Sequence, residues 1–490
     1  MKRFIKYLIM ALLTFSSFGL IFYIFKLNVL NLKPFILFSM GITIIWALLF
    51  FTLLKSKKAG LKIFTGIISL IFIVIYAFGC RYAYRTVNYI KKATNIKYEK
   101  INYKVLTLKE KEYGEVLDLT GKNIGFMSTD TYLEKSTDKL KKKMKFHDKT
   151  YEEVGTMIGS LYEGKIDALV VSDSYLEILE ENEVEFTKED KELYKYSINV
   201  IKTKEEKKID VTKDPFIVYI SGSDSRGSVS DTARSDVNIV VVVNPNKRKV
   251  LLVSIPRDYY VQLHGTTGVR DKLTHAGVYG IDMSITTIED LLGIDINYYT
   301  KVGFTAVERV VDTIDGIDID SDIDFIPHTN KSCPFKAGVQ HVDGKCALAY
   351  ARERYSYESG DRHRGQNQQT VITAIINKMT NPKYLIRYDK ILKNTEGTFE
   401  TNMSYEDITS LAKFELSDLK KWSIESYSVD GTGDMQPTYS MGSMNLYVME
   451  PDMITVKIAQ NKINDYMKNE LKSAYFICIF LIFMYNIMRY

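Results

Sequence analysis

Arginine and aspartate residues suited to phosphate chemistry gather in two clusters of this 490-residue sequence. The first cluster follows predicted strands and consists of Asp224, Arg226, Arg234, Asp236, Arg257 and Asp258. The second lies in YARERYSYESGDRHRGQNQQ and consists of Arg352, Arg354, Asp361, Arg362, Arg364, Gln368 and Gln369. Arginine is always charged, and its planar fork matches phosphate oxygens. A salt bridge or solvation explains any single arginine, but the whole set favours a phosphate-rich ligand.

Arg352 and Arg354 alternate in the sequence. If residues 349–354 form a strand, both side chains share one face. Two arginines on the inward face of such an apolar strand need an anionic partner. That partner is either a set of internal carboxylates or a bound polyanion.

Asp224 and Asp236 could hold Mg²⁺ (or Mn²⁺), with pyrophosphate oxygens completing the shell, because Mg²⁺ takes oxygen ligands and few of them from protein. Turn capping is the alternative role for both aspartates. Other familiar sites are absent from the sequence. GSDSRGS has the glycine spacing of a P-loop without its lysine, and the six histidines lack zinc spacing.

The elements that must position these residues lie within residues 215–380. Apolar runs predict strands beginning at 216 and covering 238–243 and 250–255, and helical spacing predicts helices over 283–291, 307–314 and 366–379. Continuous apolar strands are typical of a sheet covered on both faces. We therefore predict an α/β domain with a mixed central sheet flanked by helices.

Other segments surround this domain. Residues 86–113 are expected to form a basic stalk, residues 114–201 a small α/β accessory domain and residues 381–470 a C-terminal extension. The accessory segment shows no catalytic constellation and is interpreted as a ligand-sensing or spacer domain.

Three apolar runs, 4–25, 34–54 and 63–79, predict transmembrane helices within residues 1–85. Lysine and arginine before the first run and between the second and third favour a cytoplasmic side there. Three crossings then place the remainder outside the cell, as a multi-pass membrane protein. A fourth run, 474–488, is either a further crossing or an interfacial helix.

The 65 basic and 60 acidic residues give a net charge of +5, which does not suggest nucleic-acid binding. Cys333 and Cys346 bracket a loop containing proline and glycine. They could form a disulfide in an oxidising location, or could be two free buried thiols.

At these residues the sequence resembles the LytR–CpsA–Psr family of cell-envelope proteins. The likeness is carried by GSDSRG, TARSDVNIVVVV, VSIPRDYYVQL, DKLTHAGVYG, VGFTAVERVVDTIDGIDI and HVDGKCALAYARERYSYESGDRHRGQNQQ. The RERY and GDRHRG portion is similar to the capsule-associated branch. Gln366 departs from that branch, which often has another arginine there.

The resemblance implies an extracytoplasmic phosphotransferase. Such enzymes move a glycopolymer, either capsule polysaccharide or teichoic acid, from an undecaprenyl (pyro)phosphate carrier onto peptidoglycan. Carried over by motif, Asp224 and Asp236 would hold the metal, and Arg257, Arg352, Arg354 and Asp224 would serve catalysis. The implied pyrophosphate ligands are Arg234, Arg257, Arg352, Arg354, Arg362, Arg364 and Gln368.

Two other function classes stay open on sequence alone. A membrane-bound transcriptional regulator is disfavoured because the predicted cytoplasmic segments are too short for a helix-turn-helix. A protein that binds lipid-linked polymer without chemistry is the other alternative.

Overall fold

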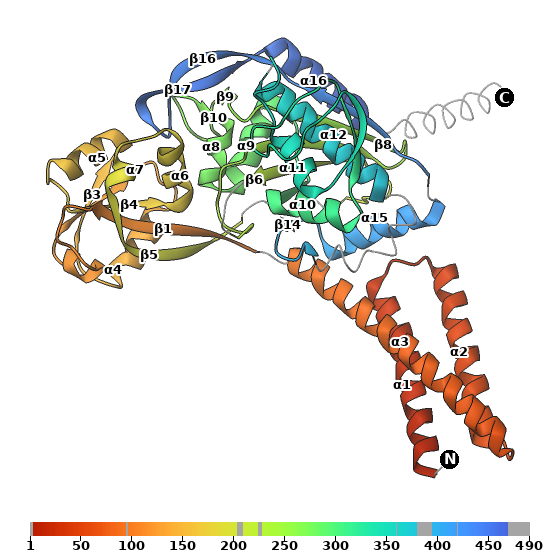
Figure 1. Ribbon diagram of the computed structural model, residues 1–490. Coiled ribbons are helices and arrows are strands. Elements are labelled where there is room, and N and C mark those ends of the chain that lie inside the picture. Colours follow the sequence, from red (N-terminus) through yellow and green to blue (C-terminus); the bar gives the residue numbers. More distant parts are fainter. Residues whose placement is uncertain are drawn as a thin grey trace, which may run out of the picture.

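The computed structural model describes residues 3–94, 97–202, 209–223, 228–358, 360–379, 394–418 and 420–468. Three units follow one another along the chain: a helical rod, a small α/β domain and a larger α/β domain (Figure 1).

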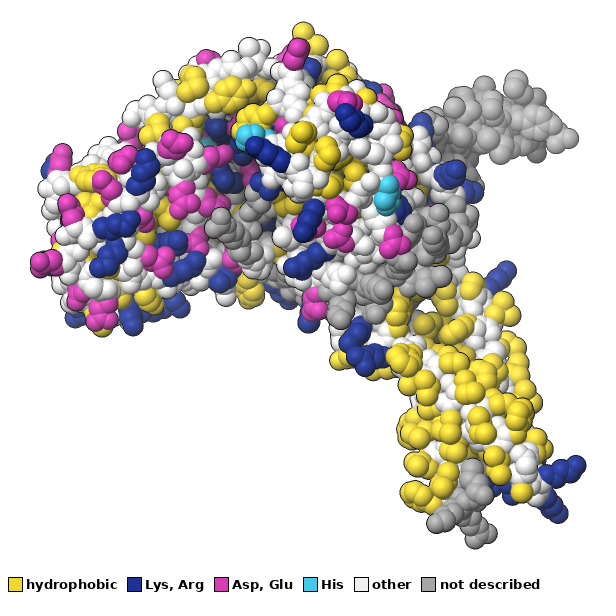
Figure 2. Space-filling model, in the orientation of Figure 1, with side chains coloured by type: hydrophobic (Ala, Val, Ile, Leu, Met, Phe, Trp, Pro, Cys, Tyr) yellow, Lys and Arg dark blue, Asp and Glu magenta, His cyan; other side chains and the backbone are white. Residues whose placement is uncertain are grey.

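The rod consists of α1 (Arg3–Leu27), α2 (Leu32–Lys55) and α3 (Ala59–Thr94). All three helices are long and apolar enough to cross a membrane. Their outer surface is almost continuously apolar (Figure 2). Near its C-terminal end α3 contacts the large domain, where the Tyr89 hydroxyl lies 2.7 Å from Thr395 Oγ1. The rod is therefore joined directly to the large domain.

The expected stalk at 86–113 is wrong. The helix α3 continues to Thr94, and β1 (Tyr98–Leu108) is an interior strand of the accessory sheet. The basic residues of this segment obscured the strand pattern in the sequence, because in the folded protein they pair with groups on neighbouring elements. Lys104, for example, lies 3.3 Å from Glu192 on the neighbouring strand.

The accessory sheet has the order β3-β2-β4-β1-β5, in which β3, β2 and β4 are parallel. Its α4 packs on one face, and α5 and α6 pack on the other. The remaining elements are η1 (Val116–Leu119), β2 (Asn123–Met127), α4 (Leu133–Lys141), β3 (His147–Tyr151), α5 (Val154–Tyr162), β4 (Ala168–Ser172), α6 (Asp173–Glu181), α7 (Phe186–Glu189) and β5 (Asp190–Ile201).

The large domain is built on a mixed six-stranded sheet of order β14-β11-β6-β7-β8-β15, as the expected fold class requires. Helices α9 and α16 cover one face and α12 lies on the other. The strands are β6 (Phe216–Ser223), β7 (Val237–Asn244), β8 (Lys249–Ile255), β11 (Tyr298–Gly303), β14 (Phe399–Thr401) and β15 (Ser423–Ser428). The helices are α8 (Leu273–Ala276), η2 (Gly277–Tyr279), α9 (Ile281–Leu292), α10 (Phe304–Thr313), α11 (Gly344–Arg352), α12 (Asp361–Met379), α15 (Tyr405–Asp418) and α16 (Met453–Met467).

Three small antiparallel pairs complete this domain: β9 (Tyr260–Val261) with β10 (Asp271–Lys272), β12 (Ile317–Ser321) with β13 (Gly338–Val342), and β16 (Gly431–Thr438) with β17 (Gly442–Pro451). The segment after 393 is therefore part of the large domain, since β14 and β15 form both edges of its sheet. The expected boundary at 380 is too early. The predicted run 474–488 lies outside the described residues.

The condition that residues 349–354 form a strand is not met. Gly344–Arg352 is the helix α11, whose N-cap Asp343 accepts a hydrogen bond from Cys346 N at 2.9 Å. Three alanines in the sequence GKCALAYAR favour the helix, and a capping aspartate stabilises its start. Alternation in sequence therefore does not place Arg352 and Arg354 on one face.

Candidate functional site

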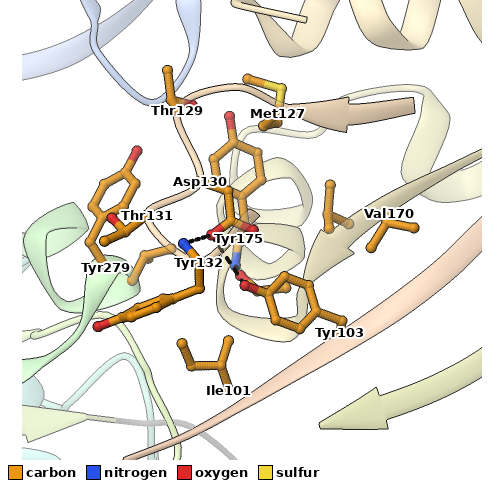
Figure 3. A pocket seen from close by; sticks show the side chains of 13 residues that line it. Ile101, Tyr103, Met127, Thr129, Asp130, Thr131, Tyr132, Val170, Tyr175 and Tyr279 are labelled. Atoms are coloured by element: carbon orange, nitrogen blue, oxygen red, sulfur yellow. Dashed lines mark hydrogen bonds between the residues drawn. The ribbon is translucent and has the colours of Figure 1, made fainter. Parts of the chain in front are cut away.

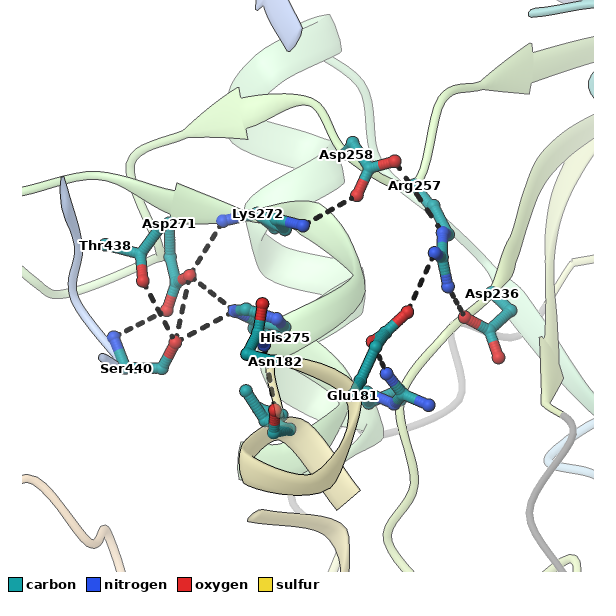
Figure 4. A network of polar contacts seen from close by, with 12 residues as sticks. Glu181, Asn182, Asp236, Arg257, Asp258, Asp271, Lys272, His275, Thr438 and Ser440 are labelled. Carbon is teal, nitrogen blue, oxygen red and sulfur yellow. Dashed lines mark hydrogen bonds and ion pairs between the residues drawn. The ribbon is translucent and has the colours of Figure 1, made fainter. Parts of the chain in front are cut away.

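The candidate site lies where β6 and β8 end and β7 begins. Gly222 pairs with Val237, and Asn238 pairs with Ile255, so these strand ends meet at one edge of the sheet. Asp236 immediately precedes β7 and Arg257 follows β8 by two residues. Arg257 Nη1 donates to Asp236 Oδ1 at 2.7 Å (Figure 4).

A carboxylate from the accessory domain completes this group. Glu181, the last residue of α6, accepts from Arg257 Nη2 at 3.0 Å through Oε1 and forms an ion pair with Arg234 through Oε2. One turn earlier on α6, Glu177 has a raised pKa because it is buried, although the charge of Arg234 acts in the opposite direction. Sequence reasoning missed Glu181 because it belongs to another domain and no motif marks it.

The helix α12 brings further basic residues to the same edge. A side chain on Gly365 would place a Cβ only 2.6 Å from Ser254 Oγ of β8, so this glycine allows close packing. Gln369 Nε2 donates to Tyr427 O at 2.8 Å and to Leu252 O at 3.2 Å, which fixes the helix to two strands.

This packing forms a small pocket that contains five residues predicted as site residues. The pocket is lined by Asp236, Ser254, Ile255, Pro256, Arg257, Arg362, Arg364, Gly365, Gln368, Ser428 and Val429. Arg362 also pairs with Asp430, a carboxylate that sequence reasoning did not identify. Three arginines line this one pocket, and guanidinium groups suit phosphate oxygens.

The aspartates of the site are held in their charged form. Burial alone would raise the pKa of Asp236, but Arg257, Arg234 and Arg364 outweigh burial and the pKa is lowered. Burial would also raise the pKa of Asp258, but the charges of Arg257 and Lys272 outweigh burial and lower it. Lys272 Nζ lies 3.1 Å from Asp258 Oδ1. Each buried carboxylate is therefore compensated by nearby cations.

Within the described structure, Arg352 and Arg354 do not line this pocket. The Arg352 guanidinium lies 5.2 Å from the centre of the Phe304 ring, and Arg354 Nη2 donates to the Tyr355 hydroxyl at 2.6 Å. The structure thus brings together four of the six predicted arginines, with Arg234 joined to the pocket through Glu181.

Asp224 lies outside the described residues, so the predicted metal pair is represented by Asp236 alone. Oδ2 of Asp236 has no hydrogen-bond partner among the described residues, and its lowered pKa keeps the group ionised. A carboxylate oxygen of this kind fits one ligand position of Mg²⁺. Within the described ranges no group of three or more His, Cys, Asp or Glu residues converges.

Cys333 and Cys346 are joined by a disulfide, with a Cα–Cα distance of 5.3 Å. The bond ties the loop before β13 to α11, whose far end carries Arg352. The disulfide therefore stabilises the fold next to the second arginine cluster.

A buried Asp–His–Ser group lies nearby without the geometry of a catalytic triad (Figure 4). Asp271 Oδ1 and Ser440 Oγ lie 2.7 and 2.8 Å from the same nitrogen, His275 Nδ1. In a triad the base bridges its two partners through opposite ring nitrogens. This group instead attaches the β16–β17 hairpin to the domain.

The fold and site define a class: a mixed α/β domain with an arginine-rich pocket, attached to membrane-type helices. The sequence profile of the LytR_cpsA_psr family matches residues 183–461, more than half of the chain. The chain belongs to this family. The match begins within the accessory domain and continues into α16, so its C-terminal end agrees with the later boundary of the large domain.

Three curated relatives carry the name polyisoprenyl-teichoic acid–peptidoglycan teichoic acid transferase. TagV of Bacillus subtilis is 31% identical over 53% of this chain and 66% of its own length. TagU of Enterococcus faecalis is 33% identical over 46% of this chain and 73% of its own. TagT of B. subtilis is 35% identical over 46% of this chain and 70% of its own length. The chain thus spans about two thirds of the length of these relatives.

Solved structures include B. subtilis TagV, at 31% identity with a TM-score of 0.44, covering 52% of this chain and 98% of that one. A structure of TagT bound to LI-WTA has 29% identity and a TM-score of 0.43, and the match covers 53% of this chain and 94% of that one.

Proposed function

We propose that this chain is a membrane-anchored transferase that moves a glycopolymer from a polyprenyl (pyro)phosphate carrier onto peptidoglycan. The observation that carries this proposal is the convergence of Arg257, Arg362 and Arg364 with Asp236 in one pocket. The names of the relatives supply the substrate class. Teichoic acid is the polymer they act on; capsule polysaccharide and the undecaprenyl form of the carrier are finer parts of the proposal.

The chemistry is displacement at phosphorus. A peptidoglycan hydroxyl attacks the phosphorus attached to the polymer, the bond from that phosphorus to the lipid phosphate breaks, and polyprenyl phosphate leaves. The hydroxyl proton passes to solvent or to the leaving phosphate. Arg257, Arg362 and Arg364 neutralise charge on the phosphoryl oxygens in the transition state.

Other predicted residues have supporting roles in this proposal. Gln368 and Arg234 border the same phosphates, and Arg352 and Arg354 contact the ligand beyond the pocket. Asp236 would hold Mg²⁺ or Mn²⁺, and the ion would supply further positive charge on the pyrophosphate when bound.

We propose that both α/β domains lie on the outer side of the cell membrane. The turn between α2 and α3 carries Lys55, Lys57 and Lys58, and basic loops stay in the cytoplasm. The disulfide supports the same orientation, because such bonds persist in oxidising compartments. Intact cells with Lys139→Cys in the accessory domain should react with a membrane-impermeant maleimide, whereas Lys57→Cys should react only after lysis. The reverse pattern would contradict this orientation.

The transfer reaction is tested with the full chain in detergent, a polyprenyl-pyrophosphate oligosaccharide and purified peptidoglycan. Arg257→Ala should lower the transfer rate by about 100-fold or more, the range for removal of one transition-state charge partner. Arg309→Ala is the matched control, since Arg309 is exposed on α10 and donates to Asn394 O. If the wild-type protein retains the lipid but shows no transfer, the chain is a binding protein and the proposed reaction is wrong.

A further inference from the structure

A second pocket lies in the accessory domain at the carboxyl ends of β2 and β4 (Figure 3). These strands are parallel and adjacent. After β2 the chain passes to α4 on one face of the sheet, and after β4 it passes to α6 on the other. In open α/β sheets, ligands bind where consecutive connections diverge in this way. The sheet therefore provides a crevice at this position.

The pocket has the composition of a cation site. Tyr279 of the large domain closes one side, and Asp130 is the one carboxylate of the lining (Figure 3). No Lys, Arg or His belongs to that lining within the described part of the chain. The lining residues are Ile101, Tyr103, Met127, Thr129, Asp130, Thr131, Tyr132, Val170, Val171, Ser172, Tyr175, Val278 and Tyr279.

Two polar groups in this pocket have capacity left for a ligand. Asp130 accepts from Tyr132 N at 2.8 Å and from the Tyr103 hydroxyl at 3.1 Å, and both bonds use Oδ1. Oδ2 accepts none among the described residues. The Tyr279 side chain is 9% exposed, and its hydroxyl has no hydrogen-bond partner within the described structure. A buried hydroxyl without a partner is energetically unfavourable.

Carboxylates lie near the aromatic rings of this pocket. Burial raises the pKa of Tyr132 to about 12, and the carboxylates Glu99, Asp282 and Asp130 add to the shift. Burial raises the pKa of Tyr279 too, and Asp130 is among the charges that reinforce it. Tyrosine faces attract cations, most strongly where water is excluded.

We infer that this pocket binds an ammonium group, which donates to Asp130 Oδ2 and to the Tyr279 hydroxyl and lies against the tyrosine rings. Among the described residues, no positive side chain that could hold an anion lines the pocket. A divalent metal would find a single carboxylate. The ammonium group belongs either to a small free amine or to an amino sugar of the cell envelope. The site does not depend on the transferase function.

Calorimetry on the full chain in detergent tests this inference with ethanolamine and its neutral counterpart ethylene glycol. Glucosamine and N-acetylglucosamine form the second pair. Saturable binding of one amine, with no binding of its neutral counterpart, is expected, and the tighter amine identifies the source. Binding of ethylene glycol or N-acetylglucosamine as tight as the amines, or no amine binding, would overturn the inference.

Asp130→Asn keeps an acceptor for Tyr132 N and removes the charge, so amine affinity should fall at least tenfold. Asp148→Asn, an exposed position paired with Lys141 in the same domain, should bind as the wild type does. Tyr279→Phe removes only an oxygen that has no partner, so this variant should fold even if Asp130→Asn does not. Its amine affinity should fall several-fold. Unchanged affinity in a folded Asp130→Asn, or in Tyr279→Phe, would overturn the assignment.

Discussion

Glu181 offers the sharpest test of how the two α/β domains cooperate. Its carboxylate already occupies the guanidinium groups of Arg234 and Arg257, so a phosphate that binds there must displace it. The change Glu181→Gln keeps the shape and removes the charge. We therefore expect tighter binding of an anionic ligand in this variant.

The size of the effect follows from the geometry. Two charges about 4 Å apart attract by about 4 kcal/mol at an effective dielectric constant of about 20. The Glu181 side chain is 36% exposed, so solvent screening reduces this to about 1–2 kcal/mol for the group. Since about 1.4 kcal/mol is a tenfold change, affinity should rise roughly 5- to 30-fold.

The assay is titration of the full chain in detergent with inorganic pyrophosphate at low and moderate salt. Glu185→Gln is the control, because Glu185 is an exposed carboxylate of the same domain that pairs with Lys188 at 3.3 Å. The gain in Glu181→Gln should shrink as salt rises. Equal or weaker pyrophosphate binding in Glu181→Gln than in the wild type would refute competition by this carboxylate.

Three further predictions concern stability. The lowered pKa of Asp236 stabilises the folded protein above about pH 4, the pKa of an aspartate in the unfolded chain, and this contribution is lost as the pH falls below that pKa. Between about pH 5 and 3, Asp236→Asn should therefore lose less unfolding free energy than the wild type, as measured by denaturant titration. Replacing Cys333 and Cys346 by serine should cost about 3 kcal/mol of unfolding free energy, because the bond spans 13 residues; an unchanged melting temperature would contradict this. Asp271→Ala should destabilise the protein by about 1–3 kcal/mol or more, because Ser440 N and His275 lose a buried acceptor, and an undiminished urea midpoint would show that the group is dispensable.

The sequence predicted the central strands well because their apolar runs are long and uninterrupted. It predicted the cluster at the strand ends because antiparallel pairing of β6, β7 and β8 brings Asp236 and Arg257 to one edge. It left residues 349–354 open, because a strand there was only a condition for placing two arginines on one face; the alanines and the cap at Asp343 favour the observed helix. Local charge spacing carried less information there than helix propensity and capping.

Long-range contacts account for the other differences. The strand β15 pairs in parallel with β8, which lies more than 160 residues earlier in the chain. No local sequence pattern predicts such pairing. Glu181 reaches the arginines only because the accessory domain packs against the large one. A surface glutamate at the end of an amphipathic helix gives no sequence signal of this role.

Whether Glu181 competes by side-chain movement or by movement of the whole domain depends on how firmly the two domains are joined. Glu99 of β1 and Lys301 of β11 form an ion pair of 2.8 Å, and both side chains are less than 10% exposed. Asn102 Nδ2 donates to Asp231 Oδ2 at 2.9 Å in the same interface. Separating the domains would break both of these buried contacts, whereas rotation of the Glu181 side chain breaks only its own ion pairs. The carboxylate should therefore leave by rotation of its own side chain while the domains stay together, and pyrophosphate should not change the spacing of spin labels placed on the two domains.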